Sequence, residues 1–490
     1  MFGKKKSHDY ERTPSVRENY TFNLLYQVLT LLTPLLTTPY VARILGADGT
    51  GVQSYTNSVV SYFAILAALG TASYGQREIA RSRKDRQERS RVFWEIELLC
   101  AGSTLICLAA WLALILVSSH YTSYYMVLTL TLVAVAFDVS WFYGGMEQYR
   151  LIAVRNMLVK LAGIAVLFLL VKKKDDLLLY VGLLAATGFL GNVSMWGYLG
   201  RYVDFVPLKE LKIRRHIRQT LIYFIPTVAT SIYTVLDKTM LGAMTEGKSQ
   251  NGYYEYATGF VNMAKILLIS FNTVMSARMS YLFAEEDYEE IDRRKEGALR
   301  FVLLLGLPIT FGLMGIAGTL IPWFLGDGYE GVIGLLAICS PLVMIVGFSD
   351  FMGSQLLTPS GQRGRSSKAI VAGACANVCL NLILIPKFAA AGAALASVAA
   401  ECLITGLYFY LCKDYLKVSM VLRCGYKNLI AALVMYAGVR MIGTALGPHM
   451  WSTLLQIIGG AGIYGVLLLV LKDKLVWDTI EEMRQKFIKV

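Results

Sequence analysis

Charged side chains occur inside long apolar stretches of this sequence, and they are the residues best suited to do chemistry. A charge at the depth of a lipid bilayer is costly, so it usually faces a cavity and binds a ligand, an ion or another charge. Three lysines, together with two arginines that flank apolar stretches, could hold an anion: Lys160, Lys238, Lys265, Arg43 and Arg155. Three carboxylates could carry a coupling proton or sodium ion: Asp138, Asp237 and Glu401.

Several of these charges also have a structural explanation. The side chains of Arg43, Arg155 and Lys160 could reach the membrane surface from near the ends of their helices. Asp237 and Lys238 could form an ion pair, although adjacent residues on a helix point about 100° apart. The four histidines fall in connections or at interfaces, so no histidine proton relay is expected.

The apolar stretches have the length of membrane-spanning helices. The chain has 490 residues, of which 56% are hydrophobic and 17% charged, and its mean hydropathy is +0.52. A soluble protein would be about a quarter charged. Lipid offers backbone groups no partner, so spans of about 20 residues must be helical. The sequence predicts an all-α polytopic membrane protein with fourteen helices, at 20–42, 53–73, 92–118, 121–144, 152–171, 177–200, 219–243, 253–276, 299–325, 331–357, 368–386, 390–412, 428–446 and 451–472.

The distribution of cations predicts the orientation. Most of the 47 Lys and Arg residues fall in the N-terminal tail and in connections on the same side of the membrane as that tail. The positive-inside rule places this side in the cytoplasm, with both termini inside. The net charge of +13 therefore reflects the orientation of the chain in the membrane, and we do not expect nucleic acid as a partner. The outside connections are short, which argues against the alternative of a membrane glycan polymerase or glycosyltransferase with an outer catalytic region.

A weak internal repeat predicts two lobes. Leu45-Gly46 followed by Gly51 and Tyr55 matches Leu241-Gly242 followed by Gly252 and Tyr256, and each copy opens a block of six helices. Such repeats are typical of transporters. The predicted parts are a cytoplasmic tail (1–19), an N-lobe (20–200), a cytoplasmic linker (201–218), a C-lobe (219–412), two further helices (413–472) and a cytoplasmic tail (473–490).

Motifs for enzymatic or cofactor chemistry are not found in the sequence. The eight cysteines form no CxxC pair, and no GK[ST] phosphate loop, HExxH motif or metal-ligand cluster occurs. We therefore expect neither an enzyme nor a resident cofactor, with proton or sodium coupling as the source of energy.

Five segments together resemble the bacterial O-antigen and exopolysaccharide flippases of the multidrug/oligosaccharidyl-lipid/polysaccharide (MOP) exporter superfamily. The resemblance spans the first twelve predicted helices. Its segments are PYVARILGADGTG (39–51), DVSWFYGGMEQYR (138–150), RNMLVK (155–160), LDKTMLG (236–242) and GACANVCLNLILIPKFAAAGAALASVAAE (373–401).

The resemblance implies a two-lobed transporter that works by alternating access in the bacterial cytoplasmic membrane. Its substrate would be an undecaprenyl-diphosphate-linked oligosaccharide, moved from the inner to the outer leaflet and passed to a polysaccharide polymerase. The cations named above would hold the diphosphate, while Asn377, Asn381 and Trp141 would contact sugar. Helix–helix hydrogen bonding for the asparagines and packing for Trp141 are the alternatives. A cation-coupled drug exporter of the same superfamily is the competing function, and it predicts an acidic, aromatic cavity.

Overall fold

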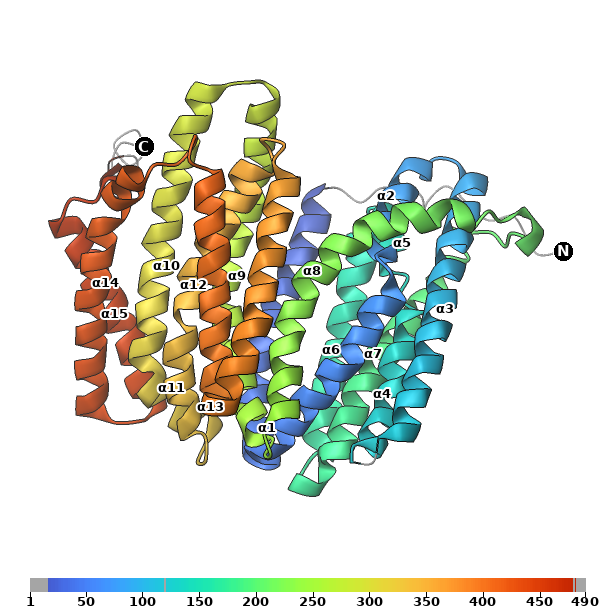
Figure 1. The fold of residues 1–490 in the computed structure, drawn as a ribbon, viewed down its shortest axis with the longest axis horizontal. Coiled ribbons are helices and arrows are strands. Elements are labelled where there is room, and N and C mark those ends of the chain that lie inside the picture. Colours follow the sequence, from blue (N-terminus) through green and yellow to red (C-terminus); the bar gives the residue numbers. More distant parts are fainter. Residues whose placement is uncertain (1–15, 119, 479–480, 482–490) are drawn as a thin grey trace. The chain divides into compact units, whose positions relative to one another are not determined.

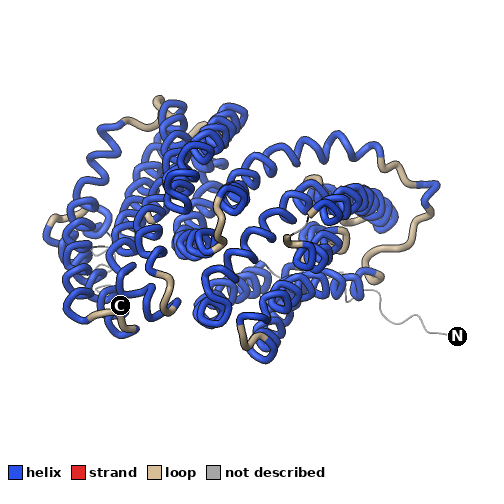
Figure 2. The backbone as a smooth tube through the Cα atoms, turned by 60° about the horizontal axis from the view of Figure 1, so that its bottom comes forward, coloured by secondary structure: helices blue, strands red, loops and turns tan. Residues whose placement is uncertain are grey.

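The chain folds into long helices that divide into two compact units. The computed structural model describes the backbone of residues 16–118, 120–478 and 481, and within these the side chains of all but 16–20, 23 and 225–234. Most of the predicted N-terminal tail and the end of the predicted C-terminal tail lie outside the described residues. Unit 1 comprises Met1–Thr239 and unit 2 comprises Met240–Val490. The described residues contain helices and loops but no strand (Figure 2).

Unit 1 contains eight helices, and its longer ones run side by side over much of their length (Figure 1). Helix α1 lies against α3, α4 and α6, and α4 lies against α7. Two short 3-10 turns, Lys174–Asp176 and Leu208–Glu210, interrupt the connections before α7 and α8. The helices are α1 (Val16–Ala68), α2 (Thr71–Ser82), α3 (Arg86–Val117), α4 (Thr122–Val135), α5 (Ser140–Gly145), α6 (Tyr149–Leu170), α7 (Leu177–Leu199) and most of α8 (Arg214–Met244).

Unit 2 has a similar all-helical construction. Helix α10 lies against α12, α14 and α15, and α9 lies against α11 and α12. A π-helical turn, Gly353–Leu357, follows α12 directly. The helices are α9 (Ser249–Ala284), α10 (Tyr288–Leu325), α11 (Glu330–Cys339), α12 (Pro341–Met352), α13 (Arg363–Leu411), α14 (Val418–Leu446) and α15 (Met450–Val470).

Two of the helices are bent and each supplies two membrane-length arms. The bend in α1 is at Gly46 (φ 70°, ψ 175°), where glycine tolerates a positive φ. The bend in α13 is at Ala389 (φ 47°, ψ −125°). Eleven described segments are long and apolar enough to cross a membrane. Counting both arms of α1 and of α13 and adding α8 gives fourteen segments, the number predicted from the sequence; their orientation stays a prediction.

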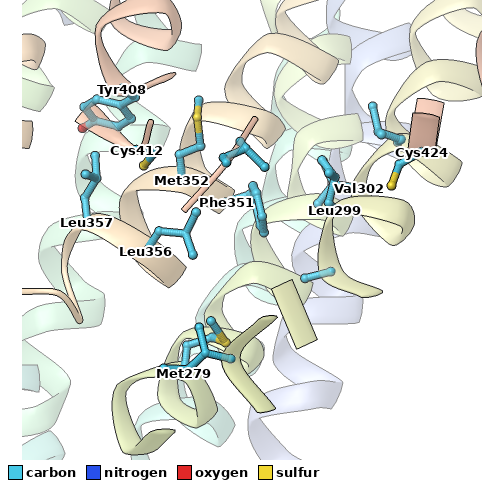
Figure 3. Close-up of a cluster of buried hydrophobic side chains, with 14 of the residues drawn as sticks. Met279, Leu299, Val302, Phe351, Met352, Leu356, Leu357, Tyr408, Cys412 and Cys424 are labelled. Atoms are coloured by element: carbon cyan, nitrogen blue, oxygen red, sulfur yellow. The ribbon is translucent and has the colours of Figure 1, made fainter. Parts of the chain in front are cut away.

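Apolar side chains both fill the cores and cover the outer surface. One core in unit 2 joins α9, α10, α12, α13 and α14 through side chains that include Met279, Val302, Phe351 and Tyr408 (Figure 3). Elsewhere large apolar side chains remain exposed, as Leu116 is at 88%. A soluble surface rarely shows so many such residues, whereas a lipid-facing one requires them.

Candidate functional site

A cavity of about 330 Å³ lies among α1, α6 and α7 of unit 1. Its size is within the usual range for small-molecule sites. The described residues that line it include two cations and no carboxylate. The polar ones are Tyr26, Thr33, Thr37, Arg155, Asn156, Lys160, Tyr180, Thr187 and Asn192.

Lys160 enters the cavity from α6 and is held by two neutral groups of α1. Its Nζ donates to Thr30 Oγ1 at 3.2 Å and lies 5.7 Å from the centre of the Tyr26 ring. A cation over an aromatic face is attracted by the ring's quadrupole. Neither contact neutralises the ammonium, so its charge can act on an anion in the cavity.

Arg155 enters the same cavity one and a half turns earlier on α6. Its Nε is buried and donates no hydrogen bond. Its guanidinium interacts electrostatically with Asp138, and more weakly with Tyr26 and Tyr143. A planar guanidinium with a free N–H is suited to bind the oxygens of a phosphate. The structure thus brings two of the predicted cations, Arg155 and Lys160, into one cavity.

Gly191 of α7 makes room for the Arg155 guanidinium. A Cβ at this position would lie 3.2 Å from Arg155 Nη1 and 3.3 Å from Val159 Cγ1, closer than ordinary contacts. We expect Gly191→Ala to displace the guanidinium and to weaken pyrophosphate binding to the detergent-solubilised protein roughly fivefold, the equivalent of about 1 kcal/mol. Isothermal titration calorimetry would measure the dissociation constant for pyrophosphate. Gly188→Ala is the matched control, because Gly188 lines the same cavity and its added Cβ would meet nothing within 4 Å; equal affinities in the two variants would contradict the prediction.

The other predicted charges of unit 1 lie away from this cavity's lining. Asp138 sits between α4 and α5, where its Oδ1 accepts from the Ser140 N–H at 3.0 Å. Asp237 of α8 is buried and acts electrostatically on Tyr62 of α1. Lys238 beside it is half-buried, and Arg43 of α1 is exposed.

Trp141 lies in the aromatic core of unit 1. It is 5% exposed, stacks on Phe93 with ring centres 5.6 Å apart, and covers Gly75 so closely that a Cβ there would lie 2.5 Å from its ring. This position agrees with the packing alternative, and the sugar contact of Trp141 stays a prediction.

Unit 2 brings together predicted residues from different helices. Lys265 of α9 is half-buried and interacts electrostatically with Glu401 of α13, which is 6% exposed. Asn377 and Asn381 are both fully buried on one face of α13, where Asn381 Nδ2 donates to Asn377 Oδ1 at 3.1 Å. The Nδ2 of Asn377 makes no hydrogen bond. Their burial suits helix packing better than access to sugar.

One buried carboxylate, Glu97 of α3, was not among the predicted site residues. It is 4% exposed, its Oε2 makes no hydrogen bond, and the charge of Asp138 acts on it. The signal was present, because Glu97 falls within the apolar segment 92–118. Its proximity to Asp138 could not be seen from the sequence.

Comparison with known protein sequences agrees with the resemblance. The profile of the family described as polysaccharide biosynthesis protein matches residues 16–282, more than half of the chain. A protein of Escherichia coli (strain K12) named "Putative O-antigen transporter" is 24% identical over 402 residues, which cover 80% of this chain and 95% of that protein. A protein of Shigella dysenteriae with the same name is 22% identical over 400 residues, with coverages of 79% and 98%.

Two solved structures share the fold at low sequence identity. A lipid II flippase, MurJ, in an inward closed conformation has a TM-score of 0.72 and 16% identity, covering 93% of this chain and 100% of that chain. An inward-facing multidrug resistance MATE transporter of the MOP superfamily has a TM-score of 0.61 and 14% identity, covering 80% and 96%. At these identities the likeness shows the fold alone. The chain is a multi-pass membrane protein whose fold is that of these two solved structures.

Proposed function

Because this chain belongs to the polysaccharide biosynthesis protein family, we propose that it is a flippase for a lipid-linked oligosaccharide. It carries undecaprenyl-diphosphate-oligosaccharide from the inner to the outer leaflet of the bacterial cytoplasmic membrane by alternating access. The translocated product then becomes available to a polysaccharide polymerase on the outer side. A proton or sodium gradient supplies the energy.

The observation that carries this proposal is the cationic lining of the unit 1 cavity. Arg155 and Lys160 meet there with threonine and asparagine side chains and no described carboxylate. A diphosphate offers several charged oxygens, and both cations act on them more strongly at low dielectric than in water. Threonine and asparagine side chains can hydrogen-bond the remaining oxygens or the first sugar.

The same lining argues against export of cationic drugs. A drug exporter needs a cavity whose charge attracts its substrate, and two cations without a carboxylate would repel it. This chain and the MATE transporter can therefore share a fold and still carry different classes of substrate.

A reconstituted flipping assay tests the proposal. The purified protein is placed in proteoliposomes with a fluorescent undecaprenyl-diphosphate-oligosaccharide, and a membrane-impermeant quencher is added outside. We expect the quenchable fraction to change with time in a protein-dependent way when a proton or sodium gradient is imposed. Protein-free liposomes, and proteoliposomes loaded with a fluorescent cationic drug, are the controls. Movement of the drug but not of the lipid-linked sugar would overturn the proposal.

A further inference from the structure

A second, smaller cavity of about 150 Å³ lies in unit 2, where α10, α14 and α15 pack against one another (Figure 1). Glycines let α10 and α14 come close, because a Cβ at Gly315 would lie 2.8 Å from Val439 Cγ1. Further along both helices, a Cβ at Gly443 would lie 3.0 Å from Thr319 Cγ2, so α10 and α14 run parallel. The described residues that line the cavity are Gly315, Gly318, Thr319, Arg440, Gly443, Thr444, Gly447, Pro448 and Gln456.

Arg440 of α14 is the one charged residue in this described lining, so the cavity has a cation and no carboxylate. Its guanidinium lies beside α10, since a Cβ at Gly318 would be 3.9 Å from Nη1. Arg440 and Gly318 are about equally far from the ends of their parallel helices, at Leu446 and Leu325. The guanidinium therefore crosses toward α10 at its own depth instead of extending toward the helix ends, where water would solvate it. The cavity is open on one side, where Arg440 and Thr444 are exposed.

Tryptophans place this end of the helices at the level of lipid headgroups. Trp451, in the first turn of α15, is 73% exposed. Trp323, near the end of α10, donates its indole N–H to Thr453 Oγ1 at 2.8 Å. Tryptophan is enriched where a membrane meets water. The exposed side chains of α14 and α15 include the apolar Met441 and Ile458, so a lipid-facing surface adjoins the cation.

We propose that this cavity binds the phosphate group of an anionic membrane phospholipid. The Arg440 guanidinium is the cationic ligand, because its planar N–H donors match the oxygens of a phosphodiester. The Thr444 hydroxyl, which donates to the Met441 carbonyl at 3.0 Å, can turn toward a phosphate or headgroup oxygen. The acyl chains would lie along the exposed apolar side chains of α14 and α15. This site is separate from the unit 1 cavity and does not depend on the proposed function.

The charge of the lining selects the class of lipid. A choline or ethanolamine headgroup carries an ammonium that no carboxylate of the described lining would balance, whereas a glycerol headgroup brings only hydroxyls. Free phosphate has the same charged oxygens but would leave the adjoining apolar side chains uncovered. The sequence predicts this end of α14 outside, where the positive-inside rule makes cations scarce. A cation at this depth is costly unless a ligand or another charge balances it, and a lipid phosphate does so.

Native mass spectrometry tests the site without any transport substrate. The full-length protein in a non-ionic detergent is titrated with phosphatidylglycerol, and the population that carries bound lipid is followed. We expect Arg440→Ala to weaken binding of the first lipid about tenfold, because it removes hydrogen bonds to a charged group. Gly318→Leu should weaken binding to a similar extent, because it fills the cavity and keeps the charge. Phosphatidylcholine should bind more weakly than phosphatidylglycerol, and Arg440→Ala should leave its affinity unchanged.

The matched control is Lys387→Ala, because Lys387 of α13 is an exposed cation of the same unit that does not line the cavity. Its affinity for phosphatidylglycerol should equal that of the wild type. Unchanged affinity in Arg440→Ala, an equal loss in Lys387→Ala, or equal binding of phosphatidylcholine would overturn the proposal. Displacement of the lipid by excess inorganic phosphate would also overturn it and assign the cavity to the free anion. Should Arg440→Ala fail to fold, Gly318→Leu decides. A negative result leaves the flippase assay untouched, and a failed flippase assay leaves this affinity to be measured.

Discussion

Removing both cations of the unit 1 cavity, with Arg155→Ala and Lys160→Ala together, should slow flipping of the lipid-linked oligosaccharide about 100-fold or more. Hydrogen bonds to charged groups contribute about 1.5–3 kcal/mol each, so losing two costs at least about 3 kcal/mol of substrate binding. A factor of ten in binding corresponds to about 1.4 kcal/mol. The measurement is the initial rate of quencher-accessible fluorescence in proteoliposomes at a substrate concentration below saturation.

A conservative variant and a matched control show how the loss of flipping rate arises. Arg155→Lys keeps the charge but loses the planar donor pair, so it should retain only part of the wild-type rate. Lys173→Ala with Lys174→Ala removes two exposed cations before α7 and is the matched control, because it changes net charge equally without touching the cavity. A rate near wild type in the double cavity variant would place the diphosphate elsewhere. Equal slowing in the control would attribute the effect to net charge.

Most of the fold could be predicted because membrane helices follow from composition. The fourteen apolar segments appear in the structure, since lipid leaves an apolar chain little choice but helix. What the pattern could not show is where helices bend or merge. The helices predicted at 20–42 and 53–73 are two arms of α1, which bends at Gly46. Helix α13 bends in the same way at Ala389. The predicted single helix 121–144 is α4 and α5 with a break at residues 136–139, because Asp138 bonds the local backbone there.

The candidate site was predictable only as a set of residue types. Arg155 and Lys160 could be chosen because a charge in an apolar segment is costly wherever it points. Their companions Asn192 and Thr187 come from α7, and nothing in the sequence relates that helix to α6 in space. For Trp141 the sequence left two roles open, because an aromatic residue in an apolar segment looks the same whether it packs or binds sugar.

A second set of buried charges secures the start of α8 to the rest of unit 1. The Glu95 carboxylate of α3 is fully buried and accepts from the Lys212 backbone N–H at 2.6 Å, from Arg215 at 2.7 Å and from His216 Nε2 at 2.7 Å. The other ring nitrogen of His216 lies 2.7 Å from the Tyr74 hydroxyl of α2. One carboxylate thus joins α3, the segment before α8 and α8 itself.

Glu95→Ala should destabilise unit 1 by about 3 kcal/mol, because it leaves His216 and the Lys212 backbone N–H without their carboxylate acceptor and leaves Arg215 paired only with the more exposed Glu88. We take the lower end of the range of free energies lost when a buried ion pair is broken, since Arg215 is 42% exposed and water can replace part of the lost interaction. For a unit of this size we expect the unfolding temperature of the detergent-solubilised protein, followed by tryptophan fluorescence, to fall roughly 6–12 °C.

The matched control, Glu88→Ala, removes a carboxylate from the same helix that pairs with the same Arg215 at 3.2 Å but is 38% exposed. Its cost should stay within about 1 kcal/mol, as for other exposed pairs. Limited trypsin digestion tests the local effect. Trypsin cleaves after lysine and arginine, and three such residues lie just before or at the start of α8: Lys212, Arg214 and Arg215. They should become cleavable once the start of α8 separates from α3. Equal unfolding temperatures in the two variants would mean that the buried Glu95 carboxylate stabilises unit 1 no more than the exposed Glu88 carboxylate does. Early melting of Glu95→Ala without cleavage near residue 212 would mean instead that the loss spreads through α3 and leaves the start of α8 in place.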